Sequence, residues 1–359
     1  TIDINAGITT DTGAITVDAD DTTTVSAAVQ ATGSGTIEFG NTGTGGLELS
    51  FANPATTSGG NITFNRPVTL NANTLISTGG GAVGGDITFV AAASINGTFS
   101  LELEAGTGDA VLGSTVGTPV TPLTSLTVSS AALARLRDDI TTNGADGIDV
   151  TATTINLDEL IMTAGTDPGA DIYLDGNVTL STGETELYAF QSITVTGTVS
   201  GAQNLTVETS TVAPSAISFS GNVGTPAQLG AITIANGYDV TFSGTVSAAS
   251  IEQLFGTGTT TFEQSVTTTG AAGIDITATN IALDGLTMTA TAADIALEGI
   301  VALSGGDVAL EAGNTITVTG TVDGGVPFSA TSTNHANIVF NDPIGGTTPL
   351  ASLSITGGD

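Results

Sequence analysis

The sequence predicts an all-β fold: a parallel β-helix, or β-solenoid, which we expect to be right-handed and to have rungs of roughly 20 residues. Three observations predict it: long stretches of the chain recur at regular offsets, short runs alternate apolar and polar residues, and the composition favours tight turns. The 359 residues include 49 Gly and only 4% aromatic residues. Chains built from such copies usually stack their repeats, so that each repeat contacts only its neighbours.

The clearest copies lie in the second and third thirds of the chain. They are GIDVTAT at 147–153 and GIDITAT at 273–279, ITVTGTV at 193–199 and 316–322, and PLTSLTV at 122–128 with its relatives QLGAITI at 228–234 and PLASLSI at 349–355.

The offsets between copies measure the repeat. The offset is 106 for Leu126 and Ile232 but 126 for Ile148 and Ile274, so the second copy has gained a segment between these points. A solenoid can absorb an insertion of this length as one additional coil, because each coil touches only the coils beside it. We therefore take the difference between the offsets, roughly 20 residues, as the length of one rung.

A smaller difference between the copies has a local cause. The stretch from Met162 to Ile172 contains the turn tripeptide Asp-Pro-Gly at 167–169, which the matching stretch from Met288 to Ile295 lacks. Turns tolerate deletions, whereas a strand that lost one residue would turn its core-facing side chains outward. We expect residues 167–169 to form a turn.

Strand-like runs such as 62–64, 87–89 and 240–242 alternate apolar residues with Thr and are separated by Gly-containing turns. The one helix-like stretch is 131–140. Its copy at 257–266 is rich in Thr and strand-like, so both are predicted to be strands.

The repeats predict one continuous solenoid over residues 1–359, although length alone would suggest two or three domains. The approximate super-repeats are 1–115, 116–222 and 223–343, with the start of another at 344–359. Roughly 18 rungs at about 4.8 Å each would extend about 85 Å. Without polar capping repeats, both ends are expected to be cut from a longer array.

Charge narrows the range of partners. The formal net charge is −32, with no Lys and three basic residues, Arg66, Arg135 and Arg137. This charge argues against DNA or RNA as a partner and against anionic membranes. No apolar run is long enough to predict membrane insertion in this segment, and the absence of Cys rules out disulfides.

Acidic residues recur at matched places in the two copies, and stacked carboxylates repel each other unless a cation lies between them. The alternative is that these side chains are solvated and cap turns. No EF-hand loop or strict nonapeptide calcium repeat is present; the run at 79–86 resembles that repeat only superficially. Calcium is the one cofactor suggested, and the candidate ligands are Asp149, Asp158, Asp171, Asp175, Asp275, Asp284, Asp294 and Glu298.

No catalytic residues are predicted. A polysaccharide lyase of this architecture needs basic residues, and Arg135 and Arg137 lie in a stretch whose copy has none. A glycosidase needs only two carboxylates and stays an open alternative. The single His335 lies in a polar loop without a nucleophile constellation and is expected to be a surface residue.

The repeats resemble the β-strand-repeat regions of giant bacterial surface proteins, of the filamentous-haemagglutinin-like adhesin and autotransporter-passenger type. The resemblance rests on the patterns at 62–70, 193–201, 316–324 and 349–353 and covers essentially the whole chain. It implies a right-handed parallel β-helix, secretion across the outer membrane and a structural or adhesive role, and it carries over no catalytic residue.

The sequence therefore predicts a non-enzymatic extracellular surface protein that forms a stiff fibre, sheath or adhesive stalk on a bacterial cell. Expected partners are further copies or array segments, and surface glycans or other cells. The alternatives are a calcium-dependent adhesion module and, second, a carbohydrate-active β-helix enzyme.

Overall fold

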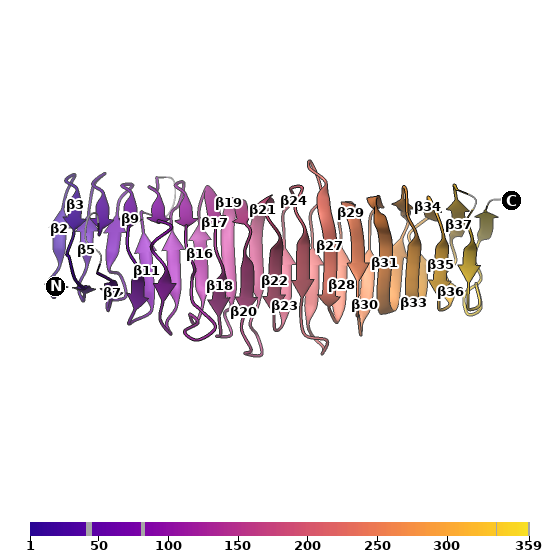
Figure 1. Cartoon of the computed structure of the whole chain (residues 1–359), viewed down its shortest axis with the longest axis horizontal. Coiled ribbons are helices and arrows are strands. Elements are labelled where there is room, and N and C mark those ends of the chain that lie inside the picture. Colours follow the sequence, from indigo (N-terminus) through magenta and orange to yellow (C-terminus); the bar gives the residue numbers. More distant parts are fainter. Residues whose placement is uncertain (41–44, 80–82, 335, 358–359) are drawn as a thin grey trace. The chain divides into compact units, whose positions relative to one another are not determined.

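A computed structural model of the chain describes residues 1–40, 45–79, 83–334 and 336–357. These residues form short β-strands joined by turns and contain no helix. Among them there is accordingly no helix that could span a membrane. The structure divides into two compact units, Thr1–Thr182 and Gly183–Asp359, and within each unit parallel strands stack rung upon rung (Figure 1). The predicted all-β solenoid is confirmed.

The strands of the first unit are β1 (Ile2–Ile4), β2 (Ile8–Thr10), β3 (Ile15–Val17), β4 (Thr23–Val25), β5 (Val29–Ala31), β6 (Ile37–Phe39), β7 (Leu47–Leu49), β8 (Ala55–Thr57), β9 (Ile62–Phe64), β10 (Val68–Leu70), β11 (Thr74–Ser77), β12 (Ile87–Phe89), β13 (Ile95–Asn96), β14 (Leu101–Glu104), β15 (Ala110–Leu112), β16 (Leu126–Ser130), β17 (Leu133–Leu136), β18 (Ile140–Thr142), β19 (Ile148–Asp158), β20 (Ile161–Ala164) and β21 (Ile172–Thr182).

Over its described residues, the first unit forms three parallel ladders. One ladder joins β1, β4, β7, β10 and β13 and passes through a bridge at Val116 to β18 and β20. A second joins β2, β5, β8, β11, β14 and β16, and a third joins β3, β6, β9, β12, β15 and β17. The long strands β19 and β21 turn a corner and continue both of these ladders.

The strands of the second unit are β22 (Thr185–Ala189), β23 (Ser192–Val195), β24 (Val199–Ser200), β25 (Leu205–Glu208), β26 (Ala216–Phe219), β27 (Leu229–Asn236), β28 (Asp239–Phe242), β29 (Val246–Gln253), β30 (Thr259–Phe262), β31 (Val266–Asp284), β32 (Thr287–Ala290), β33 (Ile295–Ser304), β34 (Val308–Ala312), β35 (Ile316–Thr319), β36 (Val322–Asp323), β37 (Pro327–Ser332), β38 (Ile338–Phe340) and β39 (Ser352–Thr356).

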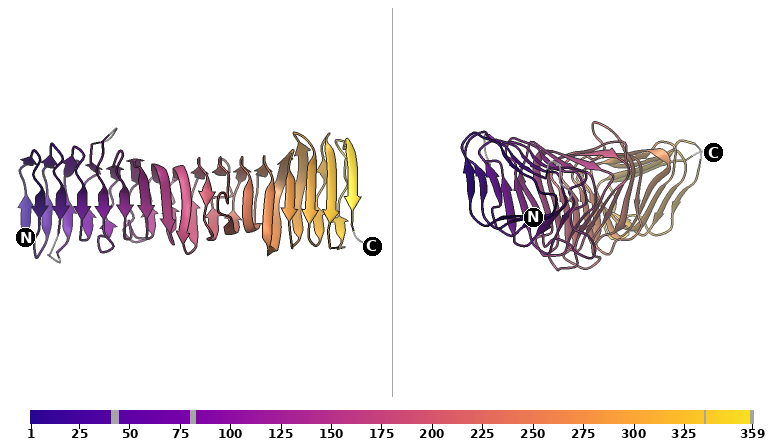
Figure 2. Two further views of the ribbon diagram at one scale, coloured as in Figure 1. Left: turned by 90° about the horizontal axis from the view of Figure 1, so that it is seen from above. Right: turned by 60° about the vertical axis from the view of Figure 1, so that its left-hand side comes forward.

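The second unit repeats this arrangement, and its described residues again form three parallel ladders. The first runs through β22, β25, β27, β29, β31, β33, β35 and β38, and the second through β23, β26, β28, β30, β31, β33 and β36. The third runs from β24 through a bridge at Val223 to β29, β31, β32, β34, β37 and β39. Figure 2 shows the stacking within each unit from two further directions.

The predicted rung length holds for some rungs, and others are longer. Thr185 pairs with Leu205 across a rung of the predicted length, whereas Leu205 pairs with Ile232 across a longer one. The extra residues lie in the corners, where the turns differ in length from rung to rung. Over the described part of the chain the strands stack in about 16 turns, somewhat fewer than the 18 predicted from a uniform rung.

The insertion inferred from the repeats is one complete rung. In the first unit Leu126 pairs directly with Ile148, so a single rung separates them. In the second unit the equivalent Ile232 pairs with Ile251, and Ile251 pairs with Ile274, so two rungs separate the same landmarks. We call residues 237–256, which contain β28 and β29, the additional rung.

Two further local predictions are confirmed, and two others concern residues that the structure does not describe. Residues 167–169 form a turn, closed by a 2.9 Å hydrogen bond from the Ala170 N–H to the Asp167 carbonyl. The helix-like stretch 131–140 forms β17 and leads into β18, and its copy forms β30 and leads into β31. His335 and residues 80–82 of the glycine-rich run are not among the described residues.

The core of each unit consists of in-register columns of apolar side chains. Side chains alternate between the two faces of a strand, so a three-residue strand sends its first and third residues inward. In the first unit Phe39, Phe64 and Phe89 form one such column, with stacked ring centroids 5.3 Å and 4.3 Å apart. Phe219, Phe242 and Phe262 form the equivalent column in the second unit, with spacings of 5.1 Å and 5.2 Å.

A charged side chain, that of Arg66, is buried in the first unit. Arg66 is 2% exposed and makes a 2.6 Å ion pair with Asp18 and a 2.8 Å hydrogen bond to the Ala19 carbonyl, nearly two rungs earlier in the chain. Its path passes Gly40, where an added Cβ would lie 2.0 Å from the Arg66 Nε. Glycine at position 40, with a φ of +76°, therefore leaves room for this tie between rungs.

Replacing the central phenylalanine of the first column, Phe64→Ala, is expected to destabilise the first unit by about 3–5 kcal/mol. The substitution removes the ring that stacks on both Phe39 and Phe89. Denaturant unfolding followed by circular dichroism measures the loss, and hydrogen exchange of the amides of β6, β9 and β12 localises it.

The matched control is Thr63→Ala on the outward face of the same strand, which should change the free energy of unfolding by no more than about 0.5 kcal/mol. Equal losses in the two variants would contradict the inward column as the source of stability.

Candidate functional site

The structure brings the predicted acidic residues together as pairs that occur at the same place in both units. Asp149 and Asp175 lie on adjacent strands, where Asp149 is opposite Tyr173 and Asp175 is opposite Thr151. Loss of hydration raises the pKa of Asp149, and the neighbouring Asp175 carboxylate raises it further. The Oδ1 atom of Asp149 is buried and has no hydrogen-bond partner in the protein. This carboxylate is therefore poorly stabilised when it is ionised.

The second copy has the same arrangement, with glutamate in place of one aspartate. Asp275 and Thr277 lie on the same strand. Asp275 is opposite Ala296, and Thr277 is opposite Glu298, which belongs to the next rung. Loss of hydration again raises the pKa of Asp275, and the charge of Glu298 adds to this effect. The recurrence in two units shows that the repulsive pair is a property of the repeat.

The matched residues Asp158 and Asp284 do not share an environment. The Asp158 carboxylate lies 3.7 Å from the Nε of Arg137 and 4.0 Å from the Nε of Arg135, so protein cations already lie beside it. Asp284 instead accepts a 3.1 Å hydrogen bond from the Ser304 hydroxyl. The arginines occur in only one copy of the repeat, which explains the difference.

Asp171 and Asp294 precede equivalent strands. Their backbone carbonyls accept hydrogen bonds from the N–H groups of Ile148 (2.8 Å) and Ile274 (3.0 Å), respectively. The Asp294 side chain also accepts a 2.8 Å hydrogen bond from the Thr315 N–H, as expected for an aspartate that caps a turn. For Asp294 the structure thus agrees with the turn-capping alternative.

Four of the eight candidate ligands consequently form two pairs, Asp149 with Asp175 and Asp275 with Glu298. The other four lie at separate positions. Among the residues that the structure describes, no group of three or more His, Cys, Asp or Glu side chains is arranged to hold a metal ion. An ion at either pair would have two carboxylates as protein side-chain ligands and would need backbone oxygens or water to complete the 6–8 oxygen ligands that calcium takes. Calcium binding stays a prediction.

A third acidic group, which the sequence analysis did not single out, surrounds Tyr188 on β22. The Tyr188 hydroxyl donates a hydrogen bond to Glu186, and this bond, together with burial and the charges of Glu186, Glu208 and Glu184, raises the pKa of the tyrosine to about 12. Glu208 accepts a 2.9 Å hydrogen bond from Asn236. These hydrogen bonds stabilise the carboxylates of Glu186 and Glu208.

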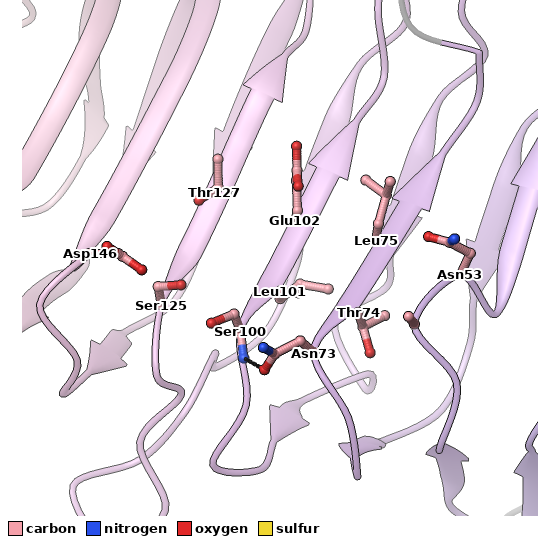
Figure 3. A pocket seen from close by; sticks show the side chains of 11 residues that line it. Asn53, Asn73, Thr74, Leu75, Ser100, Leu101, Glu102, Ser125, Thr127 and Asp146 are labelled. Atoms are coloured by element: carbon pink, nitrogen blue, oxygen red, sulfur yellow. Dashed lines mark hydrogen bonds between the residues drawn. The ribbon is translucent and has the colours of Figure 1, made fainter.

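A polar groove of about 360 Å³ lies on the outer face of the first unit, across β11, β14 and β16. Figure 3 shows two rows of side chains along it: Leu75, Glu102 and Thr127 project from adjacent strands, and Asn73, Ser100, Ser125 and Asp146 come from the segments that precede strands. The Ser100 N–H donates a 3.1 Å hydrogen bond to the Asn73 side chain. Ala52, Asn53, Thr74 and Leu101 complete the lining.

This groove offers a ligand hydrogen-bonding groups. Its lining combines hydroxyl, amide and carboxylate groups with no basic residue. Glu102 and Asp146 come from elements on either side of β16, so the groove contains the two carboxylates that a glycosidase would need. Sequence reasoning missed the groove because its residues are contributed by successive rungs and lie far apart in the chain. The sequence did contain one signal: a small polar residue, Asn73, Ser100 or Ser125, stands directly before each of the strands β11, β14 and β16.

Comparison of the chain with protein-family models, with curated proteins and with solved structures finds no match in any of the three. The resemblance to adhesin and autotransporter repeats therefore stays a prediction from the sequence.

The raised pKa of Asp149 leads to a stability test. A carboxyl whose pKa is higher in the folded than in the unfolded protein destabilises the fold above its folded pKa, and this penalty disappears as the pH falls below the ordinary value of 3.8. Asp149→Asn is therefore expected to stabilise the first unit at pH 7 by about 0.2–1 kcal/mol, the magnitude of a cross-strand charge pair. The gain should vanish near pH 3.5 in pH-dependent thermal unfolding.

Asp323→Asn is the control with the opposite sign. The Asp323 carboxylate accepts hydrogen bonds from the N–H groups of Thr347 and Thr348, which lower its pKa. Its charge therefore contributes stability at neutral pH that is lost in acid, so this variant should be less stable than the parent at pH 7. A destabilising effect of Asp149→Asn at pH 7 would contradict the repulsive-pair interpretation.

Proposed function

We propose that this chain is a structural and adhesive segment of an extracellular bacterial surface protein, and that it acts as a stiff fibre, sheath or stalk. The observation that carries the proposal is the continuous in-register core of each unit. Within a unit every rung rests on the next through backbone ladders and apolar columns, so an extended stack gains stability from each added rung without needing a globular core.

The chemistry of the surface supports a role outside the cell. A net charge of −32 keeps a strand-rich chain soluble, because like-charged surfaces repel one another. The absence of Lys and the presence of only three Arg leave few sites for trypsin-like proteases. In this proposal the mechanism is mechanical: the rungs provide stiffness, the turns present the contact surface, and cations modulate association between acidic neighbours.

The proposal is non-catalytic and includes self-association with further copies or array segments. The two carboxylates of the polar groove keep a carbohydrate-active enzyme as an alternative, but the uniform repeats do not concentrate unusual residues there. A calcium-dependent adhesion module has a more specific observation in its favour, since the same repulsive pair occurs in both units.

Electron microscopy of the native material tests the structural role. Regular elongated objects of uniform width are expected, because stacking of rungs extends one axis only. Isolated globular particles would contradict the proposal.

Calcium is tested by thermal unfolding with millimolar calcium or with a chelator. If an ion bridges the pairs, calcium raises the melting temperature because it binds only the folded chain. The increment should fall in Asp149→Asn and Asp275→Asn, whereas Asp323→Asn should keep it. Identical melting curves with calcium and with chelator would exclude the calcium module and leave the structural proposal intact.

A further inference from the structure

The additional rung of the second unit departs from the pattern of its neighbours in two ways. Gln253 points inward at 1% exposure, in a column where the adjacent residues are Ile234 and Ile276. Its Oε1 accepts a 2.7 Å hydrogen bond from the buried Thr260 hydroxyl, but its Nε2 is buried without a partner. An amide nitrogen buried without a hydrogen-bond partner loses its hydration without compensation, so this rung is not optimised for stability alone.

The same rung exposes large apolar side chains directly after Gln253. Leu254 is 54% exposed and Phe255 is 49% exposed. The first unit has no counterpart to this rung, since Leu126 pairs directly with Ile148. Departures from local rules that have no structural benefit are expected at functional sites. The corner of the second unit where Phe255 lies is therefore a candidate binding surface.

A groove of about 420 Å³ runs from Phe255 along this corner over successive rungs. Its lining includes Gly299 and Gly320, which have φ values of +145° and +120°. A Cβ at Gly299 would lie 2.0 Å from the Ala278 carbonyl oxygen, and one at Gly320 would lie 2.1 Å from the Gly299 carbonyl oxygen. No larger residue fits at these two positions, because the backbones of adjacent rungs approach each other closely there.

The walls of the groove combine an aromatic face with hydrogen-bonding groups. Phe255 and Ile300, each 49% exposed, supply apolar surface. Glu298 lies between Thr277 and Thr319 in one register column, which places a carboxylate between two hydroxyl-bearing residues. Asp342 is held at the groove by a 3.0 Å hydrogen bond that its carboxylate accepts from the Gly320 N–H.

Carbohydrate matches this combination of groups. A sugar ring presents an apolar C–H face that can cover an exposed aromatic ring, and its hydroxyls donate hydrogen bonds to carboxylates. The groove volume falls within the range of roughly 300–1,000 Å³ that is typical of small-ligand sites. The lining has no basic residue and the chain is strongly acidic, so an acidic sugar would be repelled.

We propose that the corner groove binds a glycan made of neutral or amino sugars, with one sugar ring on Phe255 and the hydroxyls of the following sugars on Glu298 and Asp342, which lie two and four rungs farther along the groove. The inference rests on the adhesive part of the proposed function and gives it a ligand. A peptide added as an extra strand fits less well, because Glu298 is already paired with Thr277 on one side and Thr319 on the other.

The test is binding of the purified chain to an immobilised panel of neutral, amino-bearing and acidic oligosaccharides, followed by calorimetry with the best binder. Binding to a neutral or amino-bearing glycan is expected. Phe255→Ala should weaken it about tenfold or more, equivalent to about 1.4 kcal/mol. Glu298→Gln should weaken it as well, because the carboxylate is the stronger hydrogen-bond acceptor.

Phe190→Ala is the matched control, since Phe190 is an exposed phenylalanine of the same unit that does not line the groove. It should leave binding unchanged. The melting temperatures of Phe255→Ala and Phe190→Ala should match the parent because these side chains are on the surface, whereas Glu298→Gln removes the charge beside Asp275 and should raise the melting temperature slightly. The absence of binding across the panel, a preference for acidic glycans or lysine-rich peptides, or equal effects of Phe255→Ala and Phe190→Ala would each overturn the proposal.

The outcome is separable from that of the structural proposal. Elongated objects in electron micrographs without glycan binding would overturn the glycan site alone. Glycan binding by isolated globular particles would overturn the stalk and retain the site.

Discussion

The constraint on which the rest of this structure depends is the parallel register between successive rungs. Each strand pairs with the equivalent strand of the next rung, so identical positions lie above one another and inward side chains form continuous columns. A slip of one residue would send the whole inward set to the surface. Changes in length are therefore tolerated as complete rungs or within turns. The additional rung of the second unit and the turn at 167–169 of the first unit illustrate both cases.

The same register determines how charge is distributed. An outward residue in one rung lies about 4.8 Å from its neighbours in the adjacent rungs. Loss of hydration raises the pKa values of Asp149 and Asp275, and a carboxylate placed diagonally on the adjacent strand raises them further. Elsewhere, the turn-capping Asp294 and the hydrogen-bonded Glu208 are stabilised by neighbouring donors. The acidic surface is consequently uneven, with repulsion concentrated where the repeat places two acids on adjacent strands.

The sequence was sufficient to predict the architecture because the information is redundant. Alternation within strands predicted which residues lie inside, and the offset change between Leu126 and Ile148 predicted one additional rung, which the structure contains. The number of rungs was less predictable, because corner turns vary in length without disturbing the ladders. The environment of Asp158 could not be predicted from the repeats either, because it depends on Arg135 and Arg137, which occur in only one copy. Neither groove could be predicted from the sequence, because the residues that line each groove come from successive rungs and form no local motif.

A perfectly regular solenoid presents the same surface at every rung and offers a ligand no preferred position. Recognition at one place requires a departure from the repeat, and the additional rung provides one. It combines a buried amide without a partner for its nitrogen, at Gln253, with an exposed aromatic ring two residues later, at Phe255. Neither feature helps the rungs to stack: the first costs stability and the second leaves apolar surface in water. Both are explained if the rung was retained for its outer surface, where the corner groove begins. The regular rungs then supply the support, and the irregular rung supplies the specificity.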